Sequence, residues 1–322
     1  MKALITGGAG FVGSHLAEEL LKGKNEVVII DNLSTGSMEN IKHLKGDKRF
    51  KYHIGSVTDE KLMSKLVKEC DVIYHLAAAV GVKYIIDNPL ESITTNVEGT
   101  GMVLELANRF GKKKTLIAST SETYGKNMDR KRAFRETDDS VLGPSTILRW
   151  SYACTKKLDE FLALAYFKEK NLPIVIVRLF NTCGPRQTGR YGMVVPRFIK
   201  QALSARPITV YGDGTQTRCF TYVKDVVKAL IDLMNCDRAV GEIFNLGNPE
   251  AISINELAKK VKRLAASKSK IEHIPYEKAY EKGFEDMMHR HPDIAKIKKL
   301  INFTPRTGVD EIIINTIEYF RG

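Results

Sequence analysis

The chain has 322 residues, of which 43% are hydrophobic and 27% charged, so it is long enough to bury one large core or two coupled ones. No apolar run approaches the length of a membrane span, and no charged-then-apolar leader precedes the first strand-like run. We therefore expect a cytoplasmic protein with no signal peptide and no membrane partner. The five cysteines are scattered without CxxC spacing, so neither a disulfide framework nor a metal site is expected.

The formal net charge of +12 invites a nucleic-acid interpretation. However, the lysines are spread through amphipathic helical stretches such as 259–263, without a basic tail or aromatic residues interleaved with basic ones. A solvated, lysine-rich surface explains the charge and also favours anionic substrates. We expect no nucleic-acid partner.

The first sixteen residues have the pattern of a strand, a tight turn and a helix. Residues 2–5 are strand-like, and Gly7, Gly10 and Gly13 follow at a spacing of three before helical periodicity begins. Glycines here let the backbone turn sharply and approach a pyrophosphate, which the free N–H groups of the next helix then bind. The cofactor contacts expected in this turn are Gly7, Gly10, Phe11, Val12 and Gly13.

An acidic residue, Asp31, ends the second apolar run at 26–30. A carboxylate at this place accepts hydrogen bonds from ribose hydroxyls and repels a 2′-phosphate, so the pattern favours NAD over NADP. The alternative is a glycine-rich turn without a ligand. The strand before the glycines, the helix after them and the acid beyond make that alternative the weaker one.

Strand-like runs alternate with helical patterns through the first half of the chain. The strand-like runs lie at 27–30, 51–54, 72–76, 115–118 and 174–177, and the helical patterns at 59–68, 92–110 and 151–170. This alternation predicts an α/β fold with a Rossmann-type, doubly wound parallel sheet, whose ligands bind beyond the carboxyl ends of the strands.

The alternation weakens after residue 180, where two short strand-like segments are mixed with helices. These segments lie at 208–211 and 242–246, with helical patterns near 195–204, 223–235, 253–266 and 309–319. We predict an NAD-binding Rossmann domain over 1–179, to which 212–247 returns. A smaller, interleaved C-terminal lobe over 180–211 and 248–322 is expected to bind the substrate.

Two motifs in the first half carry catalytic chemistry. Hydroxyls and one carboxylate in Ser119–Gly125 directly follow a strand, and Tyr152 and Lys156 share one helix face four residues apart. A lysine and a nearby nicotinamide ring favour the phenolate of such a tyrosine, which can then take the hydroxyl proton during hydride transfer. Thr120 is placed to hydrogen-bond the same substrate oxygen.

These motifs resemble those of the extended short-chain dehydrogenase/reductase family, which includes nucleotide-sugar epimerases, dehydratases and decarboxylases. The likeness runs over nearly the whole chain. It is carried by Thr6-Gly-Gly-Ala-Gly-Phe-Val-Gly, Asp31-Asn-Leu-Ser-Thr-Gly, His75-Leu-Ala-Ala, Asn96-Val-Glu-Gly-Thr, Ser119-Thr-Ser-Glu-Thr-Tyr-Gly, Tyr152-Ala-Cys-Thr-Lys and Arg178-Leu-Phe-Asn-Thr-Cys-Gly-Pro-Arg.

The resemblance implies a tightly held NAD that oxidises the sugar at C4 and is regenerated in the same cycle. It implies Thr120, Tyr152 and Lys156 as the catalytic set, and Asn181, Arg218 and Arg290 as contacts of the nucleotide-diphosphate substrate. The further cofactor contacts that it implies are Asn32, Ser34, Thr35, Gly36, Ser56, Val57, Leu76, Ala77, Ala78, Asn96, Tyr152 and Lys156. One departure is that Ser56 stands where many members carry an acid that contacts adenine.

Glu122 discriminates between members of the family. Simple 4-epimerases usually have a small or apolar residue there, and dehydratases have Asp-Glu where this chain has Ser121-Glu122. The Ser-Thr-Ser-Glu segment resembles UDP-glucuronate decarboxylases, and a β-keto acid loses CO2 once its carboxylate is positioned by a group such as Arg218. We expect a UDP-glucuronate decarboxylase, with a UDP-hexose or hexuronate 4-epimerase as the alternative. A 4,6-dehydratase, a non-catalytic sensor and a purely surface role for Glu122 are weaker alternatives.

The resemblance also implies a homodimer formed through the helices near 92–110 and 151–170. Their apolar positions exceed what one stripe against a sheet requires. These positions are Val103, Leu104, Leu106, Ala107, Leu158, Phe161, Leu162 and Leu164.

Overall fold

The computed structural model describes residues 1–127, 132–189, 193–279 and 287–322. Its centre is a parallel sheet of seven strands in the order β11-β6-β5-β4-β1-β2-β3. The strands are β1 (Lys2–Thr6), β2 (Glu26–Asp31), β3 (Phe50–Ile54), β4 (Val72–His75), β5 (Lys114–Thr120), β6 (Ile174–Leu179) and β11 (Glu242–Leu246). The strand order reverses between β1 and β4, so the predicted doubly wound Rossmann-type sheet is confirmed.

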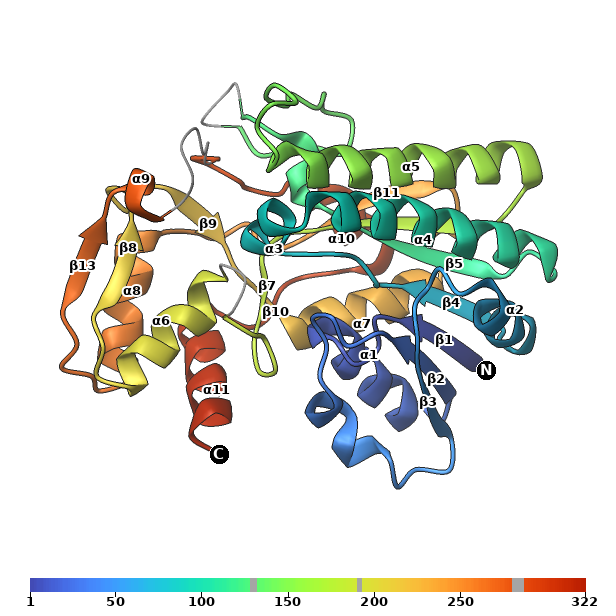
Figure 1. Ribbon diagram of the computed structural model, residues 1–322, viewed down its shortest axis with the longest axis horizontal. Helices are drawn as coiled ribbons and strands as arrows, with labels where there is room; N and C mark the ends of the chain where they lie inside the picture. Colours follow the sequence, from blue (N-terminus) through green and yellow to red (C-terminus); the bar gives the residue numbers. More distant parts are fainter. Residues whose placement is uncertain (128–131, 190–192, 280–286) are drawn as a thin grey trace.

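Helices cover both faces of this sheet (Figure 1). One layer holds α1 (Phe11–Lys22) and α7 (Val223–Met234), and the other holds α2 (Glu60–Glu69), α4 (Pro89–Arg109) and α5 (Trp150–Lys170). Successive residues of β1 pack against opposite helix layers: Ala3 and Ile5 pack on the α1 side, and Leu4 packs on the α4 side. Because both faces of the sheet are buried, the sequences of its strands are continuous apolar runs and do not alternate between apolar and polar residues.

A smaller lobe lies beside the carboxyl ends of the strands (Figure 1). It contains α6 (Val194–Leu203), β8 (Ile208–Tyr211), α8 (Ile254–Leu264), β13 (Ile271–Ile274), α9 (Tyr276–Ala279) and α11 (Val309–Arg321). Strands β8 and β13 pair in parallel, and α6, α8 and α11 contact one another. A capping box between Ser253 and Glu256 begins α8.

Short pairings connect the lobe to the large sheet. Strand β7 (Thr182–Cys183) pairs with β10 (Thr221–Tyr222), and β9 (Thr217–Cys219) pairs with β12 (Ala251–Ser253). Helix α10 (Ala295–Ile301) returns to the sheet, where it contacts β11 and α7. The chain therefore crosses between the two parts several times, and the domain boundaries given above stay a prediction.

The remaining short elements are η1 (Met38–Leu44), α3 (Val82–Asp87), η2 (Ser121–Tyr124) and η3 (Asp237–Ala239). Among the described residues, no helix is long and apolar enough to cross a membrane. In the same part of the chain, no group of three or more His, Cys, Asp or Glu residues is arranged to hold a metal ion.

Helices α4 and α5 lie side by side, but half of the apolar residues expected at their dimer face point inward. Four of the eight, Val103, Leu104, Leu106 and Ala107, are fully buried against the sheet. The argument from these four residues is therefore wrong, because the sheet and the neighbouring helices already cover them. The exposed apolar residues of this layer are Leu90, Ile93, Leu158, Phe161 and Phe167.

Candidate active site

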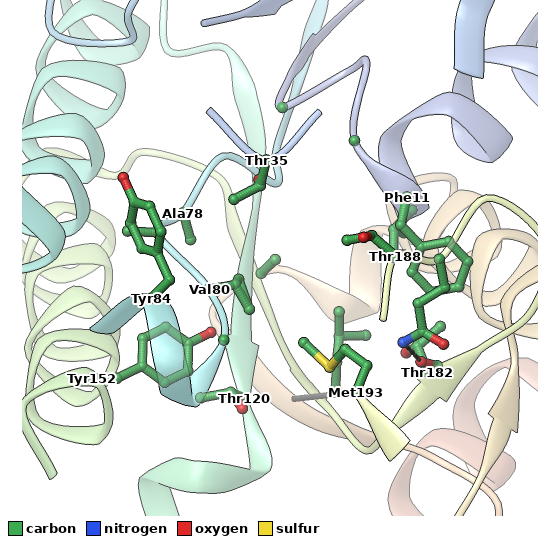
Figure 2. A pocket seen from close by; sticks show the side chains of 18 of the residues that line it. Phe11, Thr35, Ala78, Val80, Tyr84, Thr120, Tyr152, Thr182, Thr188 and Met193 are labelled. Carbon is green, nitrogen blue, oxygen red and sulfur yellow. Dashed lines mark hydrogen bonds between the residues drawn. The ribbon is translucent and has the colours of Figure 1, made fainter. Parts of the chain in front are cut away.

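A cavity of about 460 Å³ lies between the carboxyl ends of the strands and the lobe, and Figure 2 shows part of its lining. Most of the residues predicted from the sequence line it. These are Gly7, Gly10, Phe11, Val12, Gly13, Asp31, Asn32, Ser34, Thr35, Ser56, Val57, Leu76, Ala77, Ala78, Thr120, Glu122, Tyr152, Asn181, Arg218 and Arg290. Gly36, Asn96 and Lys156 are the three predicted residues that do not.

The glycine turn after β1 leaves no room for side chains. Gly7 has a φ of +69°, and a Cβ there would lie 2.9 Å from the backbone nitrogen of Ala77. A Cβ on Gly13 would lie 2.2 Å from the carbonyl oxygen of Gly7. Gly10 is the N-cap of α1 and offers no capping side chain, and the first turn of the helix carries no acid. The helix end is therefore open to an anionic group in the cavity.

The Asp31 carboxylate is fixed by the same turn. It accepts hydrogen bonds from the backbone N–H groups of Ala9 at 2.9 Å and Leu33 at 2.8 Å. Burial raises the pKa of Asp31, while these backbone donors act in the opposite direction. Gly36 lies directly beneath, because a Cβ there would come within 2.8 Å of a carboxylate oxygen of Asp31. Gly36 thus makes space for the acid rather than facing the cavity.

Asn96 also acts from behind the cavity wall. Its side-chain oxygen accepts from the backbone N–H of Ala79 at 2.8 Å, and its amide donates to the Thr155 hydroxyl at 3.3 Å. It therefore ties the loop after β4, which contributes Leu76–Ala78 to the lining, to helix α5.

Thr120 and Tyr152 face one another at the cavity wall (Figure 2). Thr120 ends β5, and its hydroxyl caps η2 by accepting from the N–H of Glu122 at 3.2 Å. Burial raises the pKa of Tyr152, and the carboxylates of Glu122 and Asp159 raise it further. A hydrogen bond with Thr120 acts in the opposite direction. In this arrangement the phenol, not the phenolate, is the favoured form.

Lys156 lies one turn further along α5 and is buried behind the lining. Its ammonium donates to the Asp159 carboxylate at 2.7 Å, and the two side chains are 2% and 1% exposed. The predicted lysine is therefore close to Tyr152 in the helix but paired with an acid that sequence reasoning did not single out. The available signal was the spacing of three residues between Lys156 and Asp159 on a predicted helix.

Two arginines hold Glu122 at the substrate end of the cavity. Its carboxylate accepts from Arg290 at 2.8 Å and from Arg149 at 3.0 Å. Although burial opposes ionisation, the charges and hydrogen bonds of these arginines lower the pKa of Glu122 to about 2. Arg290 also donates to the side-chain oxygen of Asn181 at 3.1 Å. Glu122 is therefore an ionised, buried group of the cavity and not a surface acid.

Further lining residues come from segments that the sequence did not connect. No role was expected from the sequence for Arg149 or Arg197, and both line the cavity. Other polar or aromatic side chains of this kind include Tyr84, Gln187, Tyr211, Gln216 and Tyr276. The arginines that line the substrate end make it positively charged, which suits a diphosphate or a carboxylate. They are Arg149, Arg197, Arg218 and Arg290.

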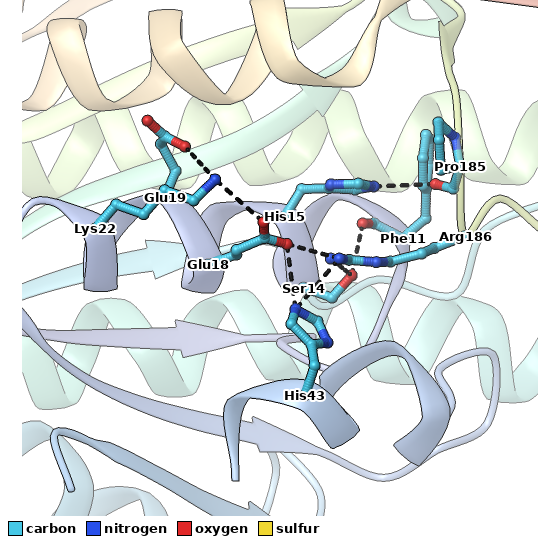
Figure 3. A network of polar contacts seen from close by, with 9 residues as sticks. All are labelled: Phe11, Ser14, His15, Glu18, Glu19, Lys22, His43, Pro185 and Arg186. Carbon is cyan, nitrogen blue, oxygen red and sulfur yellow. Dashed lines mark hydrogen bonds and ion pairs between the residues drawn. The ribbon is translucent and has the colours of Figure 1, made fainter. Parts of the chain in front are cut away.

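A polar cluster ties the lobe-side loop to helix α1 (Figure 3). Arg186 donates to Glu18 of α1 at 2.6 Å, and Glu18 also contacts His43 at 3.2 Å. Burial opposes ionisation of Glu18, but hydrogen bonds from Arg186 and Lys22 lower its pKa to about 2. The backbone of Arg186 has a φ of +68°, which is unusual for a residue with a side chain.

The fold and cavity define a dinucleotide-dependent enzyme with a second, cationic binding region. The model of the GDP-mannose 4,6-dehydratase family matches residues 4–316. A UDP-N-acetyl-alpha-D-glucosaminuronate decarboxylase from Bacillus cytotoxicus is 45% identical over 321 residues, which are 99% of this chain and 98% of that protein. UDP-glucuronic acid decarboxylase 1 of Danio rerio is 38% identical, over 99% of this chain and 72% of that protein.

Among solved structures, a UDP-glucuronic acid 4-epimerase from Bacillus cereus, in complex with UDP-glucuronic acid and NAD, has a TM-score of 0.89 and 30% identity. The match covers 100% of this chain and 99% of that one. The chain belongs to the GDP-mannose 4,6-dehydratase family of extended short-chain dehydrogenase/reductase enzymes. The predicted family, fold and enzyme class, a nucleotide-sugar decarboxylase or epimerase, are confirmed.

Proposed function

We propose that this protein is an NAD-dependent decarboxylase of UDP-linked hexuronates, with UDP-glucuronate as the first substrate to test. The observation that carries the proposal is the Glu122 carboxylate, held by Arg149 and Arg290 in the same cavity as Tyr152. A UDP-hexose brings only its diphosphate to this cationic end, whereas a UDP-hexuronate brings a carboxylate as well.

The residues of the cofactor half fit NAD. The turn at Gly7–Gly13 brings bare backbone close to the cavity, and the open N-terminus of α1 suits a pyrophosphate. Asp31 at the end of β2 suits ribose hydroxyls and disfavours a 2′-phosphate. Related solved structures contain NAD, including the Bacillus cereus epimerase and a Thermus thermophilus UDP-glucose 4-epimerase.

Tyr152 is the acid–base group of the proposed reaction. NAD, when bound, would supply reversible hydride transfer at C4 of the sugar. Tyr152 takes the proton of the C4 hydroxyl as that carbon becomes a ketone, and Thr120 hydrogen-bonds the same oxygen. The same tyrosine returns the proton when the ketone is reduced.

Oxidation at C4 makes the substrate a β-keto acid. The C5–C6 bond can then break, with its electron pair passing into the enolate of the C4 ketone as CO2 leaves. A proton, supplied in net terms by the solvent, adds at C5 before reduction at C4 completes the cycle. Arg149 and Arg290 hold Glu122 beside the reacting end, so that end combines a carboxylate with donors for the C6 carboxylate or the ketone oxygen.

Two alternatives rest on specific observations. The Bacillus cytotoxicus relative, at 45% identity, is named for the 2-acetamido uronate, so UDP-N-acetylglucosaminuronate is the second substrate to test. The Bacillus cereus structure is of a 4-epimerase in complex with UDP-glucuronic acid, so epimerisation without loss of carbon is the competing reaction.

The test is to incubate the purified protein separately with UDP-glucuronate, UDP-N-acetylglucosaminuronate and UDP-glucose, and to follow products by mass. Loss of the mass of CO2 is expected from at least one uronate. A new isomer of unchanged mass would instead favour a 4-epimerase, and loss of one water from UDP-glucose would favour a dehydratase. Either result without CO2 release would contradict the proposal.

Tyr152→Phe separates chemistry from binding. Removing the phenolic oxygen should lower turnover by at least about 100-fold, because general acid–base catalysis typically contributes that much or more. NAD should still be bound, as measured from the cofactor released on denaturation. Turnover close to that of the wild type would contradict the role of Tyr152.

A further inference from the structure

The hydroxyl of Thr217 in β9 lies between two histidine rings of the segment that carries Arg290. It is 2.9 Å from Nδ1 of His289 and 3.1 Å from Nε2 of His291. The two rings meet edge to face, with their centroids 6.2 Å apart. The backbone joins the same two segments, because the N–H of Thr217 donates to the carbonyl oxygen of Met288 at 3.0 Å. We call Thr217, His289 and His291 the histidine clasp.

The histidine clasp lies behind two arginines of the cavity wall. Arg218 directly follows Thr217 in β9, and Arg290 stands between the two histidines. Both arginines line the cavity, whereas the three residues of the clasp do not. Successive side chains of a strand point to opposite sides, and the segment around Arg290 shows the same alternation. The clasp therefore joins, from behind, the two stretches of backbone from which these arginines reach the cavity.

The two arginines repel one another. Burial lowers the pKa of Arg290; the charge of Glu122 acts in the opposite direction, and the charge of Arg218 lowers it again. On the cavity side Arg290 is held by Glu122 at 2.8 Å and by the side-chain oxygen of Asn181 at 3.1 Å. Two like charges that bind one anionic ligand need a fixed separation, and the clasp supplies a contact that opposes their repulsion.

The clasp is best formed when its histidines are neutral. A neutral pair lets the Thr217 hydroxyl donate to one ring nitrogen and accept from an N–H of the other. Burial, followed by the charges of His289 and Arg218, lowers the pKa of His291, which favours its neutral form. Protonated rings would add positive charge beside the two arginines, so acid should weaken the clasp.

Charged groups on the neighbouring elements have partners or face solvent. Arg135, from the segment that pairs with Pro292, contacts Asp293 at 3.2 Å. Glu122, from η2, is shared by two arginines of the cavity. Glu250 precedes β12, the strand that pairs with β9, and is exposed. The charges of the clasp are therefore judged against Arg218 and Arg290.

We propose that Thr217 is a positioning residue of the substrate site: its hydroxyl, shared by His289 and His291, fixes the separation of the two arginines that bind an anionic sugar nucleotide. This rests on the proposed function, in which Arg218 and Arg290 face a UDP-linked hexuronate. Thr217 acts through these arginines and not on the substrate. The support is present when the histidines are neutral and is lost as they take up protons.

Thr217→Val tests this, because it keeps the shape of the side chain and removes the hydroxyl. Affinity for UDP-glucuronate is measured by calorimetry on NAD-loaded protein in the Tyr152→Phe background, where turnover is slowed. At pH 8 the affinity should fall by about fivefold to tenfold, as expected for the loss of one or two hydrogen bonds. With the active uronate and Tyr152 intact, KM should rise similarly. The value of kcat should change by less than about threefold, because Arg149 still holds Glu122.

Three comparisons isolate the clasp. Thr217→Ser keeps the hydroxyl and should behave like the wild type. Thr215→Val is the matched control, because Thr215 is exposed, donates to Asp213 at 2.8 Å and lies outside the cavity lining. In a His289→Ala/His291→Ala background, Thr217→Val should have no further effect. The NAD content should be the same in every variant.

The pH dependence separates positioning from a general loss of stability. Histidines take up protons as the pH falls through about 6.5 and below. The ratio of wild-type to Thr217→Val affinity should therefore be largest at pH 8 and should fall to less than about twofold at pH 5. A side chain that only stabilises the fold would leave this ratio constant in folded protein.

Four results would overturn the proposal: unchanged affinity in folded Thr217→Val at pH 8, an equal loss in Thr215→Val, an equal loss in the background without the histidines, or a ratio that does not vary with pH. If Thr217→Val does not fold, His289→Ala/His291→Ala decides, and it must show the same loss at pH 8 and the same convergence at pH 5. Failure of the proposed function has a different signature, namely no CO2 from any uronate with the wild-type protein while affinity for UDP-glucuronate still depends on Thr217.

Discussion

The Glu122 carboxylate lies between two guanidinium groups at the substrate end of the cavity, and each partner comes from a different part of the chain. Arg149 is the N-cap residue of α5, whereas Arg290 lies 168 residues from Glu122 in the sequence. With Glu122 ionised the cluster carries two positive charges and one negative one. Losing the carboxylate leaves two buried guanidinium groups without their shared acceptor.

Glu122→Gln should therefore lower the free energy of unfolding near neutral pH by on the order of a few kcal/mol. The two arginines lower the pKa of the Glu122 carboxyl from its ordinary value of 4.5 to about 2 in the folded protein. Its contribution is therefore present above pH 4.5 and is lost as the pH falls toward 2. The difference in free energy of unfolding between variant and wild type, measured from urea-unfolding curves, should therefore become smaller as the pH falls from 4.5 toward 2. Glu39→Gln, at an exposed pair, is the control; a difference that does not vary with pH would contradict this prediction.

At the scale of elements, helix α1 is tied to a loop of the lobe side by Arg186. Its N-terminus faces the cavity, while Ser14 and Glu18, one turn apart, meet Arg186 of the loop that follows β7 (Figure 3). The next residues of that loop, Gln187 and Thr188, line the cavity. The contact thus connects the predicted pyrophosphate site to the loop that covers it.

We expect Arg186→Met to weaken retention of NAD, because the loop at Gln187 and Thr188 loses its attachment to α1. The expected result is at least about a tenfold faster dissociation of NAD, consistent with the loss of a charged hydrogen bond. NAD content after desalting and the dissociation rate in a chase with unlabelled NAD measure this directly. Arg49→Met removes an ion pair on the surface, to Asp47, and should have no effect. Equal retention in both variants would show that the contact only stabilises the fold.

At the scale of the whole molecule, the layer of α4 and α5 presents apolar side chains to solvent. Leu158 and Phe161 of α5 are 50% and 62% exposed, and Leu90 and Ile93 of α4 are 77% and 40% exposed. Large exposed apolar residues gathered on two adjacent helices are typical of an interface between subunits. We propose that the homodimer implied by the family resemblance uses these residues, rather than the buried ones named from the sequence.

Phe161→Glu should convert the dimer to a monomer at micromolar concentration, because it places a charge in the apolar face of α5. Light scattering or sedimentation velocity on the NAD-loaded protein measures the change. Tyr319→Glu, at a comparably exposed aromatic residue of α11, should leave the oligomeric state unchanged. A wild-type protein that is monomeric at the same concentration would remove the proposal.

The sequence by itself determined the sheet, the glycine turn and the enzyme class. Gly7 is required by its own φ of +69° and Gly13 by its close approach to the carbonyl oxygen of Gly7, and the apolar runs follow from burial on both faces of a parallel sheet. These constraints act over short stretches of chain, so spacing and periodicity reveal them. The three long helical patterns before residue 171 appear as α2, α4 and α5 with boundaries shifted by at most three residues.

Only the tertiary structure decided which charges meet. The pairing of Glu122 with Arg290, and of Arg186 with Glu18, each joins residues 168 positions apart, and no local pattern distinguishes these arginines from the many others on the surface. The structure also placed Lys156 behind the cavity, against Asp159, although the helix spacing with Tyr152 was visible in the sequence. Buried charges need partners of opposite sign, because folding removes them from water. Which charges become buried together depends on how the lobe packs over the sheet. The order of residues along the chain does not reveal that packing.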